Sequence, residues 1–145
     1  MAYFEKSLFL KRSSLPNAGK GLFTKSDIPK KEIIVEYKGS VHKWKDIKHE
    51  DGHNGYLFKV NNNVVLNALK YKKSFARYAN DARGFTKILG LRNNAEYLVK
   101  KDKVYVISIR KIHKGEEILV PYGKKYWDLM KKIHSEKAVK QKSSH

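Results

Sequence analysis

The fold of this chain is decided by three short segments: Phe-Ala-Arg-Tyr-Ala-Asn-Asp at 75–81, Asn-Asn-Ala-Glu-Tyr at 93–97, and Gly-Glu-Glu-Ile-Leu-Val-Pro-Tyr at 115–122. In each segment, short polar side chains stand beside aromatic or β-branched residues rather than within a run of charge. This mixture is typical of a pocket with apolar walls and a few placed donors and acceptors. The sequence therefore predicts that these segments build a functional site.

The composition is that of one folded domain. A chain of 145 residues with 41% hydrophobic residues can bury a core, which argues against disorder. It has no cysteine, so disulfides and thiolate zinc sites are excluded, and a reducing compartment is the natural expectation. No apolar run is long enough to cross a bilayer, and the basic N-terminus lacks an apolar signal-peptide core. We therefore expect an intracellular protein that is cytoplasmic or associated with a nucleus or nucleoid, and that does not associate with a membrane.

The net charge is +18, from 32 Lys and Arg against 14 Asp and Glu. Such a field favours anionic partners, including nucleic acid, acidic protein surfaces and anionic membrane surfaces. The alternative is a lysine-rich but merely soluble surface, since the lysines are scattered and form no compact basic motif. Composition alone leaves both interpretations open.

The hydrophobic pattern predicts many short strands and few helices, with no alternating strand–helix rhythm, so a parallel Rossmann sheet is disfavoured. The fold class is mainly β, a β-rich α+β domain. Strands are predicted at 8–10, 22–24, 32–37, 56–60, 64–66, 95–99, 104–109 and 117–120. Helical turns are predicted at 44–49 and at 74–78, where Ser74 is a candidate cap, and a longer helix at 124–138. Segments 51–55 and 82–92 are predicted loops, and 139–145 a disordered tail.

Four blocks in order resemble the SET-domain family, the lysine methyltransferases that use S-adenosylmethionine. The blocks are Ala-Gly-Lys-Gly-Leu-Phe at 18–23; Glu-Tyr at 36–37 with Gly39; the segments at 75–80 and 94–97; and Gly-Glu-Glu-Ile at 115–118 with Tyr-Gly at 122–123 and Tyr-Trp at 126–127. Each block is weak alone, but all four in order at plausible distances are specific. The resemblance covers residues 7 to about 127, and the missing cysteines exclude the zinc-binding cap that many relatives place after the domain.

The resemblance implies several small, curved antiparallel sheets over residues 1–130, followed by a helix end and basic tail at 131–145. It also implies that the C-terminal segment threads under a preceding loop, a rare exception to the usual rule on connections. This threading would place Asn80 next to Tyr122. The helix from Lys124 is a candidate to close the channel in place of the zinc cap, and no metal is expected.

The implied reaction moves a methyl group from S-adenosylmethionine to the ε-amine of a lysine on a protein substrate, such as a histone or another DNA-associated basic protein, leaving S-adenosylhomocysteine. The amine must first lose its proton, since a free lysine has a pKa of ~10.4. An aromatic channel helps because it desolvates the lysine and attracts cations. By resemblance, Tyr122 is the catalytic tyrosine and Tyr56 lines the lysine channel. A ring packed in the core is the alternative for Tyr56.

The cofactor site implied by the resemblance is built mainly from backbone. Lys20, Gly21 and Leu22 would approach the methionine part, with Gly21 leaving space, and Asn80 would bind the methionyl amino group. The other residues placed there are Arg77, Tyr78, Asp81 and Trp127. Asp81 stands where the family usually has histidine, and Trp127 stacks on adenine, closes the channel or packs in the core. Asn94 and Glu117 are interpreted as structural.

A second hypothesis is a SET-like binding module without turnover, which binds nucleic acid or chromatin-like complexes through its charge of +18. The two hypotheses are compatible, because a basic enzyme can be recruited to DNA that carries its basic substrate.

Overall fold

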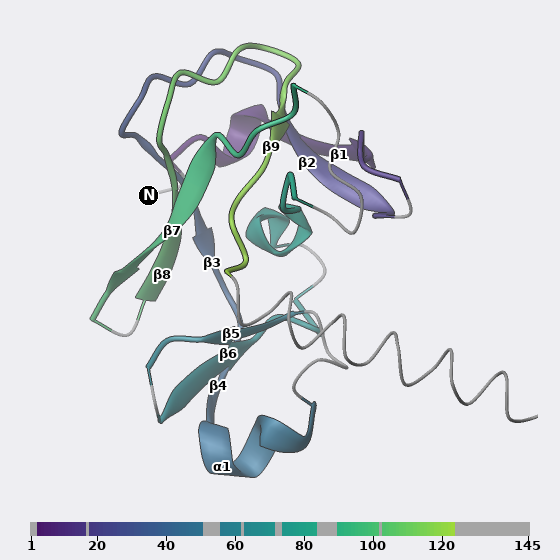
Figure 1. Cartoon of the computed structure of the whole chain (residues 1–145). Helices are drawn as coiled ribbons and strands as arrows, with labels where there is room; N and C mark the ends of the chain where they lie inside the picture. The colour runs from purple at the N-terminus through teal and green to yellow at the C-terminus, as the bar shows by residue number, and fades with distance from the viewer. Residues whose placement is uncertain are drawn as a thin grey trace, which may run out of the picture.

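The computed structural model describes residues 3–16, 18–50, 56–61, 63–71, 74–83, 90–101 and 103–123. In this part of the chain the strands form three small antiparallel sheets (Figure 1). The first, in the order β1-β2-β9, contains β1 (Leu8–Arg12), β2 (Lys20–Thr24) and β9 (Glu117–Ile118). The second, in the order β3-β8-β7, contains β3 (Ile33–Tyr37), β8 (Lys103–Ser108) and β7 (Ala95–Lys100). The third, in the order β4-β6-β5, contains β4 (Ser40–Lys43), β6 (Val64–Asn67) and β5 (Leu57–Lys59).

The helical elements in the described residues are short. They are the 3-10 turns η1 (Glu5–Ser7), η2 (Lys48–Glu50) and η3 (Phe75–Tyr78) and the single-turn helix α1 (Trp44–Ile47). The prediction of a mainly β fold with small antiparallel sheets is confirmed. Within the described residues, no helix has both the length and the apolar character to cross a membrane.

The structure differs from the local predictions at β4, at the cap of η3 and at β9, which ends at Ile118 rather than at residue 120. Strand β4 was missed, because its sequence Ser-Val-His-Lys holds one apolar residue and Val41 is 69% exposed. This strand forms through its antiparallel ladder with β6, which no local pattern shows. In addition, Ser74 makes no side-chain capping bond to η3. The predicted helix at 124–138, the tail at 139–145 and the loop at 51–55 lie outside the described residues, as do 84–89 of the predicted loop at 82–92.

Strand β8 shows why these residues form a core. Val104, Val106 and Ser108 are buried, while the residues between them are half-buried, as the two-residue period of a strand requires. Because β8 pairs with both β3 and β7, its buried face adds to that of β3, where Ile34 is fully buried. The core joins β2 and β9 through Leu22 and Ile118.

The C-terminal segment runs from β9 through the middle of the molecule (Figure 1). Leu119 forms a parallel bridge with Asn80, and Val120 N donates to Asn80 O at 2.8 Å. On its other side, Leu119 O accepts from Asn94 N at 3.0 Å and from Ala95 N at 3.1 Å. The segment after β9 therefore lies between two earlier segments and is bonded to both. This is the juxtaposition that the resemblance implied.

Candidate active site

Tyr122 is fixed at two points to the segment that follows η3. Its hydroxyl donates to Ala79 O at 2.6 Å, and its backbone N–H donates to Asp81 Oδ2 at 2.9 Å. Asn80 lies between these two partners in the sequence. The structure therefore brings Tyr122 against residues 79–81, although more than 40 residues separate them in the chain. A phenol hydroxyl has one donor and two acceptor positions, and the contact with Ala79 uses the donor.

Asp81 is 4% exposed, and its carboxylate is directed at protein donors. Its Oδ1 accepts from Arg83 N at 2.9 Å and from Asn93 Nδ2 at 3.1 Å, while Oδ2 accepts from Tyr122 N. A carboxylate has about four acceptor positions and can serve three such donors at once, whereas a neutral imidazole has one acceptor nitrogen. This explains why aspartate suits the position that the resemblance assigns to histidine. Asn93 was missed by the sequence analysis, because only the fold places it beside Asp81.

Asn94 and Glu117 form a frame that holds together the crossing, the place where residues 119–122 pass between residues 79–81 and residues 94–95. The buried carboxamide of Asn94 donates to Glu117 O at 2.8 Å and accepts from Leu119 N at 2.9 Å. The buried Glu117 carboxylate accepts from Ser13 Oγ at 2.6 Å, from Ser14 N at 2.9 Å and from Asn80 Nδ2 at 3.4 Å. The structural interpretation of both residues agrees with these contacts. No sequence signal could have identified Ser13, which is 104 positions from Glu117.

The first glycine block lies beside this frame. Asn80 Nδ2 donates to Lys20 O at 3.1 Å, so the predicted neighbours Lys20 and Asn80 are in contact. Leu22 is fully buried and pairs with Leu10 on one side and Ile118 on the other. A Cβ built on Gly21 would overlap Glu117 Oε2 and lie 3.2 Å from Ser13 Cα. The space that Gly21 leaves is therefore filled by the Glu117 carboxylate.

Gly21→Ala is expected to destabilise the protein by about 1–3 kcal/mol, because the added methyl group overpacks against Glu117. Urea denaturation of the variant measures this loss. In a Glu117→Ala background the cost of Gly21→Ala should shrink, since the overlapping carboxylate is gone. An equal cost in both backgrounds would refute the proposed overlap.

Arg77 contacts the rings of two tyrosines, Tyr56 and Tyr78. Its guanidinium carbon lies 4.2 Å from the Tyr56 ring centroid and 4.7 Å from that of Tyr78. The same group donates to Ala68 O at 2.9 Å, to Leu69 O at 2.7 Å and to the Tyr78 hydroxyl at 2.8 Å. Its buried Nε has no hydrogen-bond partner. Tyr56 therefore already carries a cation on its ring, and Arg77 is a fixed, partly desolvated charge beside it.

Tyr37 binds the backbone of Tyr56. Its hydroxyl donates to Tyr56 O at 2.9 Å, and its ring packs against those of Phe58 and Tyr97, with centroids 5.5 and 6.1 Å away. Burial raises the pKa of the Tyr37 hydroxyl well above its ordinary value, and the charge of Arg77 opposes this only in part. The sequence predicts Tyr37 at the end of a strand, but its contact with Tyr56 depends on the fold.

The raised pKa of Tyr37 predicts a loss of stability at high pH. Below about pH 10 the hydroxyl is protonated in both the folded and the unfolded chain, so it contributes no pH dependence. Above that pH the unfolded chain releases the proton and the folded chain keeps it. The free energy of unfolding should then fall by up to about 1.4 kcal/mol per pH unit from this group. Urea denaturation between about pH 9 and pH 11 should show a shallower fall in Tyr37→Phe than in the unmodified protein; parallel curves would contradict the assignment.

The acceptors beside Asn80 suit a cationic ligand. S-adenosylmethionine carries an ammonium group and a sulfonium, both of which need acceptors or electron-rich surroundings. Asn80 uses its amide N–H groups toward Lys20 and Glu117, and no described residue donates to its Oδ1. This oxygen belongs to the amide that contacts the Lys20 carbonyl, so two acceptors are close together and the residues present fit the group. Trp127 lies outside the described residues, and within them no group of three His, Asp or Glu side chains is arranged to hold a metal ion.

The family is decided by a comparison with protein-family models. The model described as SET domain matches residues 19–123, which include Gly21, Asn80, Asn94 and Tyr122. The chain belongs to the SET-domain family. The hydrogen bonds of Tyr122, Asn80 and Asn94 lie within this range, whereas Ser13 and Ser14, which bind Glu117, precede it.

Relatives of the SET domain carry enzyme names. Histone-lysine N-methyltransferase 2D of Homo sapiens is 29% identical over 138 residues, which cover 90% of this chain and 2% of that protein. Histone-lysine N-methyltransferase EZH2 of Chaetomium thermophilum is 28% identical over 142 residues, which cover 88% of this chain and 9% of that protein. The chain thus spans only a small part of the length of these relatives.

A solved structure shares the fold. It is a humanized mutant of the Chaetomium thermophilum Polycomb Repressive Complex 2 bound to the inhibitor GSK126, with a TM-score of 0.68 and 22% identity. The similarity covers 90% of this chain and 16% of the other. This likeness supports the SET fold for the described sheets and their crossing.

Proposed function

We propose that this SET domain transfers a methyl group from S-adenosylmethionine to the ε-amine of a lysine on a protein substrate, a histone or another DNA-associated basic protein. The observation that carries the proposal is the double attachment of Tyr122 to residues 79–81. It puts a phenol next to Asn80, whose acceptor oxygen suits an ammonium group. The names of the relatives support turnover over the alternative of a SET-like module without activity.

Tyr122 would orient the incoming amine. Because its proton is donated to Ala79 O, the hydroxyl oxygen meets an amine as an acceptor. An acceptor favours the amine pose whose lone pair is directed away from the hydroxyl and toward the methyl donor. Asp81 holds the backbone of Tyr122 and so acts as a positioning residue rather than a cofactor contact. Correct orientation can contribute several kcal/mol, up to ~7, to such a displacement.

The amine must be neutral to attack. Tyr56 and Tyr78 would form apolar walls, which disfavour the charged form of a lysine. The fixed charge of Arg77 on both rings adds a like charge, which lowers the lysine pKa further. We therefore propose that the positive charge of Arg77, on the far side of the tyrosine rings, favours loss of the proton from the substrate lysine.

The bound cofactor supplies the sulfonium methyl group. Lys20 O and Asn80 Oδ1 would accept from its ammonium group. Gly21 lies in the part of β2 that β9 does not pair, and Leu22 remains a proposed neighbour of the ligand. Arg77 and Tyr78 complete the wall, and Trp127 remains a proposed contact. The proposed location of this enzyme is the cytoplasm, the nucleus or the nucleoid, where its basic protein substrates associate with nucleic acid.

The test is methyl transfer from labelled S-adenosylmethionine to recombinant core histones and to a panel of other basic proteins. Mass spectrometry should find the increment of one or more methyl groups on lysine side chains, and excess S-adenosylhomocysteine should suppress it. No transfer to any protein, together with no cofactor binding by calorimetry, would overturn the proposal.

A further inference from the structure

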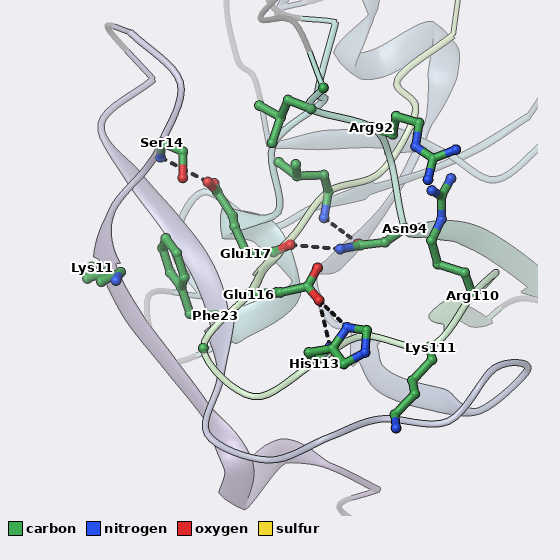
Figure 2. Close-up of a pocket in the computed structure, with 14 residues that line it drawn as sticks. Lys11, Ser14, Phe23, Arg92, Asn94, Arg110, Lys111, His113, Glu116 and Glu117 are labelled. Carbon is green, nitrogen blue, oxygen red and sulfur yellow. Dashed lines mark hydrogen bonds and ion pairs between the residues drawn. The ribbon is translucent and has the colours of Figure 1, made fainter.

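A pocket of about 460 Å³ lies beside the frame of Asn94 and Glu117 (Figure 2). It is bounded by β1 and β2 and by the segments before β7 and after β8. Five basic side chains take part in its lining: Lys11, Arg92, Arg110, Lys111 and His113. Tyr56, Lys20, Asn80 and Tyr122 do not line it. With the crossing, the pocket shares Asn94, Glu117 and Leu119.

The two carboxylates of the pocket are engaged within the protein. Glu116 Oε1 accepts from His113 N at 2.9 Å and contacts the His113 imidazole at 2.5 Å. Glu117 is buried and serves Ser13, Ser14 and Asn80. These bonds fix both carboxylates in place, but each keeps its negative charge and offsets part of the positive charge of the lining.

The four Lys and Arg side chains of the pocket make few direct ion pairs. Among the described residues, no carboxylate oxygen lies within 4.0 Å of Lys11, Arg92 or Arg110, and Lys111 reaches Asp27 only at 4.0 Å on the exposed surface. Figure 2 shows the guanidinium groups of Arg92 and Arg110 projecting to the same side of the pocket. Four Lys and Arg side chains against two carboxylates leave a net positive lining, which favours an anion.

We propose that this pocket binds the phosphate backbone of nucleic acid. Guanidinium groups match the oxygens of a phosphate with two parallel hydrogen bonds. Arg110 is already oriented by its bond to Asn93 O at 2.6 Å, which leaves further N–H groups for a ligand. The net charge of +18 favours a polyanion over a single small anion, because each added phosphate meets further positive charge.

The lining indicates recognition without sequence readout. Phe23 is 3% exposed, stacks on Phe9 with centroids 5.7 Å apart, and has the Lys11 ammonium 4.5 Å from its centroid. It therefore offers no face on which a base could stack. Phosphate contacts position a protein on nucleic acid but carry no sequence information. The proposal does not depend on methyl transfer.

The test compares two variants of the full chain that each lose two positive charges. Lys11→Gln with Arg92→Gln alters the pocket. Lys45→Gln with Lys48→Gln alters exposed residues in and after α1, at the opposite end of the molecule (Figure 1). Fluorescence anisotropy with a labelled DNA duplex, at several salt concentrations, measures affinity and its salt dependence. The pocket variant should bind about tenfold more weakly, and its salt slope should fall by about two units. The control variant should change both quantities far less.

Three further measurements complete the design. Thermal unfolding checks that both variants fold, and methyl transfer to a free peptide should be unchanged in the pocket variant, which separates this proposal from the catalytic one. Two duplexes of unrelated sequence should bind equally. Equal losses in the two variants, or tighter binding of polyglutamate or inorganic phosphate than of the duplex, would overturn the nucleic-acid assignment.

Discussion

Tyr122→Phe is expected to lower the rate of methyl transfer by on the order of 100-fold while the protein stays folded. The change removes the hydroxyl that donates to Ala79 O and keeps the ring and the backbone bond to Asp81. Without this hydroxyl the amine loses its acceptor, and the ring loses the contact that fixes its direction. Loss of one hydrogen bond costs only about 0.5–1.5 kcal/mol of stability, so the fold should survive.

The matched control for this prediction is Tyr71→Phe, which removes a hydroxyl from a ring that is 42% exposed. Its rate should stay within about twofold of the unmodified protein, as expected for a surface change. Steady-state methylation of a histone substrate, with thermal unfolding of both variants, makes the comparison. A Tyr122→Phe enzyme of normal rate would remove the orienting role of the hydroxyl.

Asn94→Ala is expected to cost about 2–6 kcal/mol of unfolding free energy. The Asn94 carboxamide donates to Glu117 O and accepts from Leu119 N, both in the buried crossing. Alanine would leave a buried carbonyl and a buried N–H without these partners, and each such loss costs about 1–3 kcal/mol. Since the crossing holds Tyr122 in place, activity should fall together with stability.

Asn61→Ala provides the control, because Asn61 Oδ1 also accepts two backbone N–H groups, from Asn63 and Val64, but at the surface. Water can replace those bonds, so the expected loss is about 0.5–1 kcal/mol. Urea denaturation of the two variants measures the difference. Similar losses in both would mean that burial of the crossing contributes little.

Much of the fold was predictable because its strands are locally encoded. The burial patterns of the β-branched runs in β3 and β8 are those that their sequences indicate. The four ordered blocks indicated the family. Strand β4 was not predictable, since its pairing with β6 supplies what its own sequence lacks. The same holds for the two-residue strand β9, predicted to be longer, where Leu119 leaves the sheet and bridges Asn80 instead.

The candidate site was predictable in its members but less so in their contacts. The blocks identified Tyr122, Asn80 and Lys20, which the fold brings together. They could not show that Gly21 makes room for Glu117, or that Arg77 stacks on Tyr56. These contacts join residues that are far apart in the chain, so they form only when the chain folds and cannot be inferred from local sequence.

A crystal structure of the chain with S-adenosylhomocysteine tests the assignment of this site. The ligand should lie beside Lys20 and Gly21, with its ammonium group bonded to Asn80 Oδ1 and the Tyr122 hydroxyl facing its sulfur. A ligand bound in the basic pocket of Lys11 and Arg92, or a Tyr122 hydroxyl directed away from the bound ligand, would contradict it.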